Sequence, residues 1–248
     1  MNSLERLVGI LDEFEGADSL LTTEQLHDRL GLTRSTLYRY LKVLTDAGLL
    51  ASFHGIGYSL GPRVIELDYR IRMHDPLLAA SRPLMRALAQ EYEGIVLLCR
   101  RFQDRVLCVH QEASTEAFRS RYERGQLRSL FHGAASRVIL AHLPAPRLRR
   151  LYAAQSEEFA RTGTGKSLAE ARAILRSIRQ AGFTVSHGQV TPGLTGVGAP
   201  VFDGGGCILG SICLVVEAED LPRGLAAGMG ERVKSAAAGI SAALAPSA

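Results

Sequence analysis

The chain has 248 residues, of which 46% are hydrophobic and 22% charged, and its net charge is +4. This length suits one large domain or two modest ones, and the contrast between the two parts of the chain favours two. No apolar run approaches the ~20 residues of a membrane-spanning helix, and the N-terminus lacks the basic leader and cleavage site of a signal peptide. We therefore expect a cytoplasmic protein that contacts no membrane.

The cysteines and histidines give no sign of a disulfide framework or a metal centre. The four cysteines form no C-x-x-C pair, and the seven histidines form no H-x-x-x-H or H-E-x-x-H pair. In a chain without export signals, we expect the thiols to be reduced and buried. We predict neither a metal nor another cofactor. The cysteines are Cys99, Cys108, Cys207 and Cys213.

Residues 1–62 have the pattern of a winged helix-turn-helix. Residues 3–14 predict an amphipathic helix that packs under the motif, with an apolar face of Leu4, Leu7, Val8 and Leu11. Thr22 and Gln25 have the spacing of a capping box at the start of a second helix. Gly31 stands where the turn of this motif commonly carries glycine, and Thr33 can cap the third helix.

The third helix and the segment after it carry the residue types that bind DNA. A helix stop at residues 46–48 and a glycine-rich turn at residues 54–57 predict a short β-hairpin, the wing. On the third helix, polar and basic side chains project away from the leucines, as in helices that bind phosphates and read base edges. A histidine in the wing turn can meet DNA as well, although an exposed loop histidine needs no function. The candidate DNA-binding residues are Thr33, Arg34, Ser35, Thr36, Tyr38, Arg39, Lys42 and His54.

The charge of this segment is acidic overall. Residues 1–61 hold five basic and eight acidic side chains, a net charge of −3. Between Thr33 and Thr45, however, there are three basic side chains and no acidic one. We therefore expect DNA binding to depend on a local positive face and to weaken as salt is added.

The rest of the chain predicts a second, mixed domain. Gly61 and Pro62 close the first unit, residues 63–73 predict a connecting helix, and Pro76 begins a long helix that ends at Glu91. Strands in meanders with helices between them predict an α+β fold built on an antiparallel sheet. The sequence shows no internal repeat and no low-complexity tract beyond a C-terminal tail of small residues. The expected strands are 95–99, 106–110, 183–186, 196–202 and 207–216, and the expected helices are 134–143, 146–153 and 168–181.

Two further motifs suggest nucleotide or nucleic-acid binding but have simpler explanations. Residues 160–167, ARTGTGKS, approach a phosphate-binding loop, yet the preceding LYAAQSEEF predicts a helix where such a loop requires a buried strand. We therefore expect a plain loop with Ser167 capping the next helix. Residues 118–128 hold four arginines. A solvated sheet edge, an oligomer contact or recognition of an anionic effector is favoured there over a second nucleic-acid patch.

The order of these pieces resembles the IclR family of bacterial transcription regulators, nearly end to end. The segments that carry the resemblance are LTTEQLHDRLGLTRSTLYRYLKVLTDAGLL, GYSLGPRVIELD, GQLRSLFHGAASRVILAHL and IRQAGFTVSHGQVTPGLTGVGAPVFDGGGCILGSICLVV. The resemblance implies a winged helix-turn-helix (residues 1–62), a connecting helix (63–76) and a GAF-like effector-binding domain (77–248). It also implies double-stranded DNA and a small-molecule effector as ligands, and homodimers that pair into tetramers, a dimer of dimers, on DNA.

The resemblance also suggests where an effector binds. Family members that bind small acids have an aspartate, a cysteine and two serines where this chain has Ser186, Gly196, Cys213 and Val215, and commonly a glutamate near Gln189. These replacements predict a roomier, less polar pocket, for an effector larger and more apolar than glyoxylate or pyruvate, such as an aromatic acid or a related catabolite. The candidate effector-binding residues are Phe131, His132, Gly133, Ala134, Ser186, Gly196, Cys213 and Val215. The candidates for meeting an anion are His132, Arg119, Arg121, Arg124 and Arg128.

We therefore expect a sequence-specific DNA-binding regulator, controlled by a small effector and acting as a symmetric dimer on a palindromic operator. Two alternatives stay open: a winged-helix module that contacts protein rather than DNA, and a C-terminal domain that turns over its ligand. The enzymatic alternative has little support, because the sequence shows no G-x-S-x-G elbow and no paired carboxylates on one helical face. We do not expect an enzyme.

Overall fold

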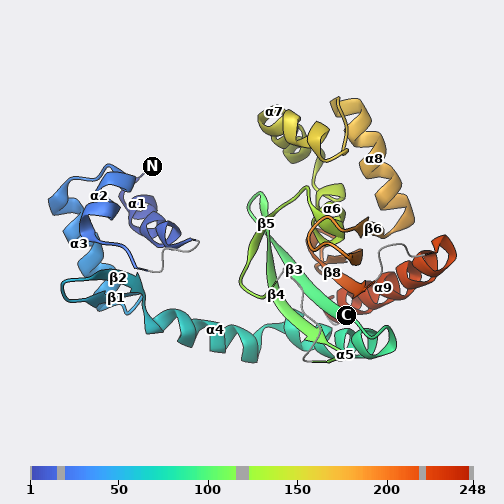
Figure 1. The fold of residues 1–248 in the computed structure, drawn as a ribbon, viewed down its shortest axis with the longest axis horizontal. Helices are drawn as coiled ribbons and strands as arrows, with labels where there is room; N and C mark the ends of the chain where they lie inside the picture. The colour runs from blue at the N-terminus through green and yellow to red at the C-terminus, as the bar shows by residue number, and fades with distance from the viewer. Residues whose placement is uncertain (1, 16–19, 116–122, 218–221, 246–248) are drawn as a thin grey trace. The chain divides into compact units, whose positions relative to one another are not determined.

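The computed structural model describes most of the chain, namely residues 2–15, 20–115, 123–217 and 222–245. The chain divides into two compact units, residues 1–75 and residues 76–248, and we describe each by itself (Figure 1). Among the described residues, no helix combines the length and the apolar character needed to cross a bilayer.

In its described residues, the first unit contains helices and an antiparallel hairpin. Its elements are α1 (Ser3–Gly9), the 3-10 helix η1 (Ile10–Phe14), α2 (Thr23–Leu30), α3 (Arg34–Asp46), β1 (Leu50–Phe53), β2 (Gly57–Leu60) and α4 (Pro62–His74). The predicted capping box of Thr22 and Gln25 is present, and α2 ends at Gly31 in the left-handed conformation (φ +61°). The Thr33 hydroxyl caps α3 by accepting a hydrogen bond from the Thr36 N–H. The local signals for the helix-turn-helix and its wing are confirmed.

The predicted helix over residues 3–14 is wrong in its second half. The α-helix ends at Gly9, a poor helix former, and the chain tightens into η1. The predicted apolar face is also wrong in part, because Leu4 and Val8 are 72% and 57% exposed. Ile10, which the helical pattern did not select, is fully buried in the core of the first unit.

Helix α4 confirms the predicted connecting helix and extends it by one residue at each end. Pro62 occupies the first helical position, where the missing N–H would be unpaired in any case. All residues of α4 are described, and every one of them is half-buried or exposed. Apart from Ile65 and the other apolar residues, the helix is rich in charged side chains.

The second unit is built on an antiparallel sheet, as predicted. Its strands lie in the order β5-β4-β3-β8-β7-β6, and helices cover both faces (Figure 1). Its elements are α5 (Pro76–Glu91), β3 (Ile95–Phe102), β4 (Arg105–Ala113), β5 (Leu127–Ser129), α6 (Gly133–Ala141), α7 (Ala145–Arg161), α8 (Leu168–Ala181), β6 (Thr184–His187), β7 (Leu194–Phe202), β8 (Ile208–Glu217) and α9 (Arg223–Ala243).

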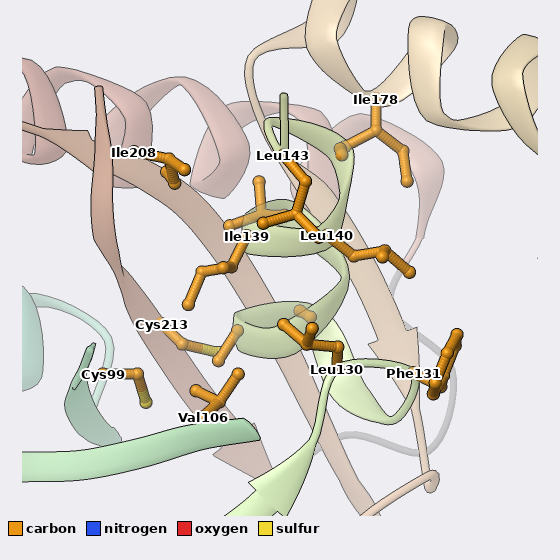
Figure 2. Packing of buried hydrophobic residues seen from close by; sticks show 14 of the residues in the cluster. Cys99, Val106, Leu130, Phe131, Ile139, Leu140, Leu143, Ile178, Ile208 and Cys213 are labelled. Atoms are coloured by element: carbon orange, nitrogen blue, oxygen red, sulfur yellow. The ribbon is translucent and has the colours of Figure 1, made fainter. Parts of the chain in front are cut away.

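Alternation along the central strands divides the second unit into two cores. On β3, Leu97 and Cys99 face the core that contains α6, whereas Val96 and Leu98 face the core that contains α5 and α9. Figure 2 shows the first of these cores, in which α6 lies between the sheet residues Ile208 and Cys213 and Ile178 of α8. Eight of the nine residues of α6 are buried, so the sheet and the outer helices hold this helix on all sides.

Four features of the second unit differ from the sequence predictions. The expected C-terminal tail is α9, whose Val233 and Ile240 are fully buried against the sheet. Strand β5 is not among the expected strands, although a sheet edge was one interpretation of residues 118–128, and α7 continues to Arg161 through a kink at Gln155, eight residues beyond its expected end. Of the cysteines predicted to be buried, Cys207 is exposed, while the other three are buried and all four are free.

The burial of α9 predicts that this helix stabilises the second unit. Ile240→Ala should lower the free energy of unfolding by about 2–5 kcal/mol, because it removes a fully buried side chain and leaves a cavity. Leu225→Ala is the matched control on the same helix, since Leu225 is 53% exposed, and should change stability by about 0.5 kcal/mol or less. Urea denaturation followed by circular dichroism measures both. Equal effects of the two substitutions would contradict the packing described for α9.

Candidate functional site

Helix α3 separates its apolar and polar residues cleanly. Leu37, Tyr40, Leu41 and Leu44 are buried in the core of the first unit. Thr36 is half-buried. The other candidate DNA-binding residues of this helix are exposed, namely Arg34, Ser35, Tyr38, Arg39 and Lys42. The helix therefore presents three cations and an exposed tyrosine on the side away from the core.

Three of the candidate hydroxyls interact with one another at the start of α3. The Thr33 Oγ1 accepts a hydrogen bond from the Thr36 N–H at 3.4 Å and donates one to the Thr36 Oγ1 at 2.9 Å. The Ser35 Oγ lies 3.5 Å from the same Thr33 oxygen. Thr33 and Thr36 therefore serve first to cap the helix, and the cap holds Ser35 and Arg34 in the first turn.

The positive face of α3 is partly neutralised. The Lys42 Nζ lies 2.9 Å from the Asp46 Oδ2, one turn further along the helix. Asp46 follows directly after the acid-free stretch, so a count of charges by segment missed this pair. Both side chains are largely exposed, and such a pair contributes little stability, so a DNA phosphate can replace the carboxylate. The Arg39 guanidinium lies 5.4 Å from the centre of the Tyr40 ring, in a cation–π contact.

The wing combines a histidine with apolar side chains. His54 is exposed in the turn between β1 and β2, as predicted. Phe53 and Ile56 beside it are 46% and 60% exposed, and sequence reasoning did not single them out although they flank the glycine turn. Backbone hydrogen bonds between Leu21 and Tyr58, at 2.8 and 2.9 Å, tie the wing to the residues before α2.

The second unit contains a pocket between the N-terminal end of α6 and strands β6, β7 and β8. It brings together all the candidate effector residues except Phe131, which is buried in the core with its ring 4.8 Å from that of Phe159. Gln189, noted from the sequence, also lines it. The lining residues that sequence reasoning did not select are Leu97, Ala135, Val190, Thr191 and Leu194.

The pocket is smaller than the sequence predicted. Water can occupy about 40 Å³ of it, within an empty volume of about 430 Å³ that includes the open mouth. This space holds a few water molecules, whereas pockets that enclose an organic ligand typically measure about 300–1,000 Å³. The replacements at Ser186 and Gly196 therefore do not produce a roomy cavity in this conformation.

The polar groups of the pocket gather at the first turn of α6. The Ala134 N–H donates to the Ser186 Oγ at 3.0 Å, and the Gly133 N–H donates to the Gln189 Oε1 at 3.0 Å. Gly133 has φ +79°, a left-handed conformation that favours glycine. A Cβ on Gly196 would lie 3.2 Å from the Ser186 Oγ and 3.4 Å from the Cys213 Sγ, so glycine keeps the space between them open.

Cys213 is an inert part of the pocket wall. Burial raises the pKa of its thiol to about 12, so the side chain is a neutral thiol at physiological pH. Cys207, its neighbour in the β7–β8 hairpin region, is exposed. This contrast fits a small buried hydrophobe at position 213 rather than a redox pair.

His132 stands at the pocket beside a group of charged residues on α7. Its Nδ1 lies 2.9 Å from the Ser129 Oγ, and the Arg161 Nη2 lies 3.3 Å from its Nε2. Arg161 also forms two hydrogen bonds with Glu158, which hold the pKa of that carboxyl below its usual range. Arg161 was not predicted, because the second half of α7 was not.

Of the arginines expected to meet an anion, the two that the structure describes lie outside the pocket. The Arg124 Nε donates to the backbone oxygen of Val109 at 2.9 Å, and Arg128 is in the edge strand β5. Neither lines the pocket, and Arg119 and Arg121 lie outside the described residues.

The phosphate-binding motif is absent in structure, because α7 rather than a strand precedes it and Ser167 caps α8. Within the described ranges, no group of three or more His, Cys, Asp or Glu residues could hold a metal ion.

Comparison with known proteins agrees with both halves of the structure. Residues 3–52 match the IclR helix-turn-helix domain, and residues 72–242 match the C-terminal domain of the bacterial transcriptional regulator IclR. The transcriptional regulator KipR of Bacillus subtilis is 26% identical over 186 residues, which cover 74% of this chain and 73% of KipR.

Solved structures show the same fold. An IclR transcriptional regulator from Alicyclobacillus acidocaldarius matches with a TM-score of 0.78 at 22% identity, over 97% of this chain and 98% of that one. An IclR homologue from Microbacterium hydrocarbonoxydans, crystallised with 4-hydroxybenzoate, matches with a TM-score of 0.72 at 20% identity, over 98% and 99%. This chain belongs to the IclR family of bacterial transcriptional regulators.

Proposed function

We propose that this regulator binds a palindromic operator through α3 and that an organic acid with an apolar body, such as an aromatic acid, controls the binding. The observation that carries the DNA-binding part is the division of α3 into a buried apolar side and an exposed side with three cations. Arg39 and Lys42 contact phosphate or guanine, while Arg34, Ser35 and Tyr38 reach the bases. Thr33 and Thr36 position the first turn, and His54 approaches DNA from the wing.

A homodimer would place two copies of α3 on the two half-sites of such an operator. Helix α4 supports a dimer, because Ile65, Tyr69, Ile71 and Met73 are each more than half exposed. Apolar side chains gathered on a helix without buried residues favour burial against a second copy. Pairing of two dimers on DNA would give the tetramer expected from the family.

The chemistry of the pocket supports an anionic effector. The first-turn N–H groups of Gly133 and Ala134, at the positive end of the α6 dipole, donate to the lining side chains Gln189 and Ser186, which a ligand's acceptor could replace. None of the described residues that line the pocket is acidic, and most are apolar. A carboxylate on an aromatic or aliphatic body suits this combination, and the complex of the Microbacterium hydrocarbonoxydans homologue with 4-hydroxybenzoate supports the same class of ligand.

The effector would act as a signal rather than as a substrate. The neutral thiol of Cys213 is a poor nucleophile, so the pocket suits binding without turnover. To control transcription, the effector must bind more tightly to one arrangement of the DNA-binding units than to another. Helix α4, which joins the two units in sequence, is our candidate for the element that transmits the change. The protein would work in the cytoplasm, where its DNA ligand lies.

The DNA-binding assignment predicts that removal of the cations of α3 lowers the affinity for all DNA sequences by a similar factor. Arg39→Ala together with Lys42→Ala should abolish detectable operator binding at physiological salt. Each single substitution should reduce the slope of log K against log salt by about 1. Fluorescence anisotropy on DNA selected from a random-sequence library measures both. Asp46→Asn is the matched control: it frees Lys42 from its ion pair and should leave binding equal or tighter. Unchanged binding by the double variant would remove α3 from the DNA interface.

The effector assignment predicts that a methyl group at position 196 blocks binding. Gly196→Ala places a Cβ between Ser186 and Cys213, and should weaken the binding of benzoate or 4-hydroxybenzoate by about tenfold or more. Gly228→Ala is the control, because nothing lies within 4 Å of a Cβ there. A thermal-shift titration of the two variants and the wild type measures the effect. Equal stabilisation of all three by the same acid would place its binding site outside this pocket.

A further inference from the structure

The pocket must open before it can admit an organic acid. The space of about 40 Å³ is too small for an aromatic ring with a carboxylate. Most of its wall consists of α6, β6, β7 and β8, whose backbone hydrogen bonds oppose movement. Of the described lining residues, only His132 and residues 189–191 lie outside helices and strands. His132 is held by Ser129 and Arg161, so the loop that contains residues 189–191 is the part of the wall that can move at least cost.

A side-chain hydrogen bond joins this loop, residues 188–193, to α6 at the pocket. The Gln189 Oε1 accepts the Gly133 N–H at 3.0 Å, across 56 positions of sequence. The next residue, Val190, packs so closely that its Cγ2 would lie 2.8 Å from a Cβ on Gly133. At the base of the loop, the Gly188 N–H donates a hydrogen bond to the Leu194 oxygen at 2.9 Å. Breaking the Gln189 contact would therefore weaken the hold of α6 on the loop without disrupting the strands beside it.

The Gly133 N–H also limits what can replace Gln189. Gly133 is buried, and a buried donor that loses its acceptor destabilises the complex in which it is left unpaired. A ligand that displaces the glutamine must therefore bring an acceptor oxygen to the same N–H. A carboxylate does so with a full negative charge at the positive end of the helix.

We infer that Gln189 is a built-in competitor of the effector: its amide oxygen closes the pocket and admits only ligands whose own acceptor can replace it on Gly133. This inference rests on the proposed effector site. It assigns Gln189 a role opposite to that of a residue that grips the ligand, because Gln189 must leave for the ligand to bind. Removing its side chain should therefore favour binding, and strengthening its contact should oppose binding.

The first test needs no ligand and uses the cysteines as reporters. Cys213 lines the pocket and is buried, Cys207 is exposed, and Cys99 and Cys108 are buried elsewhere in the same core. Labelling with methyl methanethiosulfonate, followed by mass spectrometry, gives the rate at each thiol in one sample. Cys207 serves as the reference for reagent dose, and Cys99 and Cys108 report unfolding of the domain.

Gln189→Ala should raise the labelling rate of Cys213 by about threefold to tenfold, because one neutral hydrogen bond no longer holds the loop. Gln189→Glu should lower that rate, since a carboxylate is a stronger acceptor at a helix N-terminus. Gln180→Ala, an exposed glutamine on α8, is the matched control and should change nothing. A Cys213 rate in Gln189→Ala equal to that of the wild type would overturn the inference. If the labelling of Cys99 and Cys108 in Gln189→Ala also becomes faster, that variant has partly unfolded and Gln189→Glu decides. Labelling of Cys213 in Gln189→Glu that is no slower than in the wild type would then overturn the inference.

The second test is calorimetric titration with benzoate and 4-hydroxybenzoate. Gln189→Ala should bind the acid about threefold to tenfold more tightly than the wild type, and Gln189→Glu more weakly. Weaker binding by Gln189→Ala would show that the glutamine grips the ligand, and would overturn the inference. If none of the three proteins binds either acid, the proposed class of effector fails, whereas the labelling rates still decide whether Gln189 closes the pocket.

Discussion

The packing of α6 against the sheet is the constraint on which the second unit depends. Eight of its nine residues are buried, between the strands on one side and α8 on the other (Figure 2). A helix held in this way cannot shift to suit a ligand, so its first turn offers donors at fixed positions. The pocket therefore has one rigid end, at Gly133 and Ala134, and one adjustable side, at the loop of Gln189.

The first unit applies the same principle to DNA. Four buried side chains fix α3 in the core, and the cap at Thr33 fixes its first turn. The polar face can then meet DNA without the loss of freedom that a mobile segment would suffer on binding. Its cations form a local positive face on a domain that is acidic overall, and one of them, Lys42, forms an ion pair with Asp46. Affinity should therefore depend on placement more than on total charge.

Local patterns predicted the elements whose signals lie within a few residues of one another. The capping box at Thr22, the left-handed Gly31 and the wing turn all belong to this class. Helix α9 was missed because its many glycines and alanines give little amphipathic pattern, and only the long-range packing of residues such as Ile240 reveals it. The pocket residues came from the family resemblance. The hydrogen bond between Gln189 and Gly133 crosses 56 positions, so no local pattern contains it. The pair of Lys42 and Asp46, by contrast, follows from i,i+4 spacing and could have been predicted.

Control of transcription by an effector requires that the pocket and the DNA-binding helix be coupled. The most direct measurement is the dissociation constant for a selected operator, determined by fluorescence anisotropy at rising concentrations of an aromatic acid that binds the pocket. We expect the dissociation constant to shift with acid concentration and to reach a plateau. At the plateau, its fold-change should equal the fold-change that the operator causes in the affinity for the acid. An operator affinity that stays constant while the acid saturates the pocket would show that the two sites are not coupled.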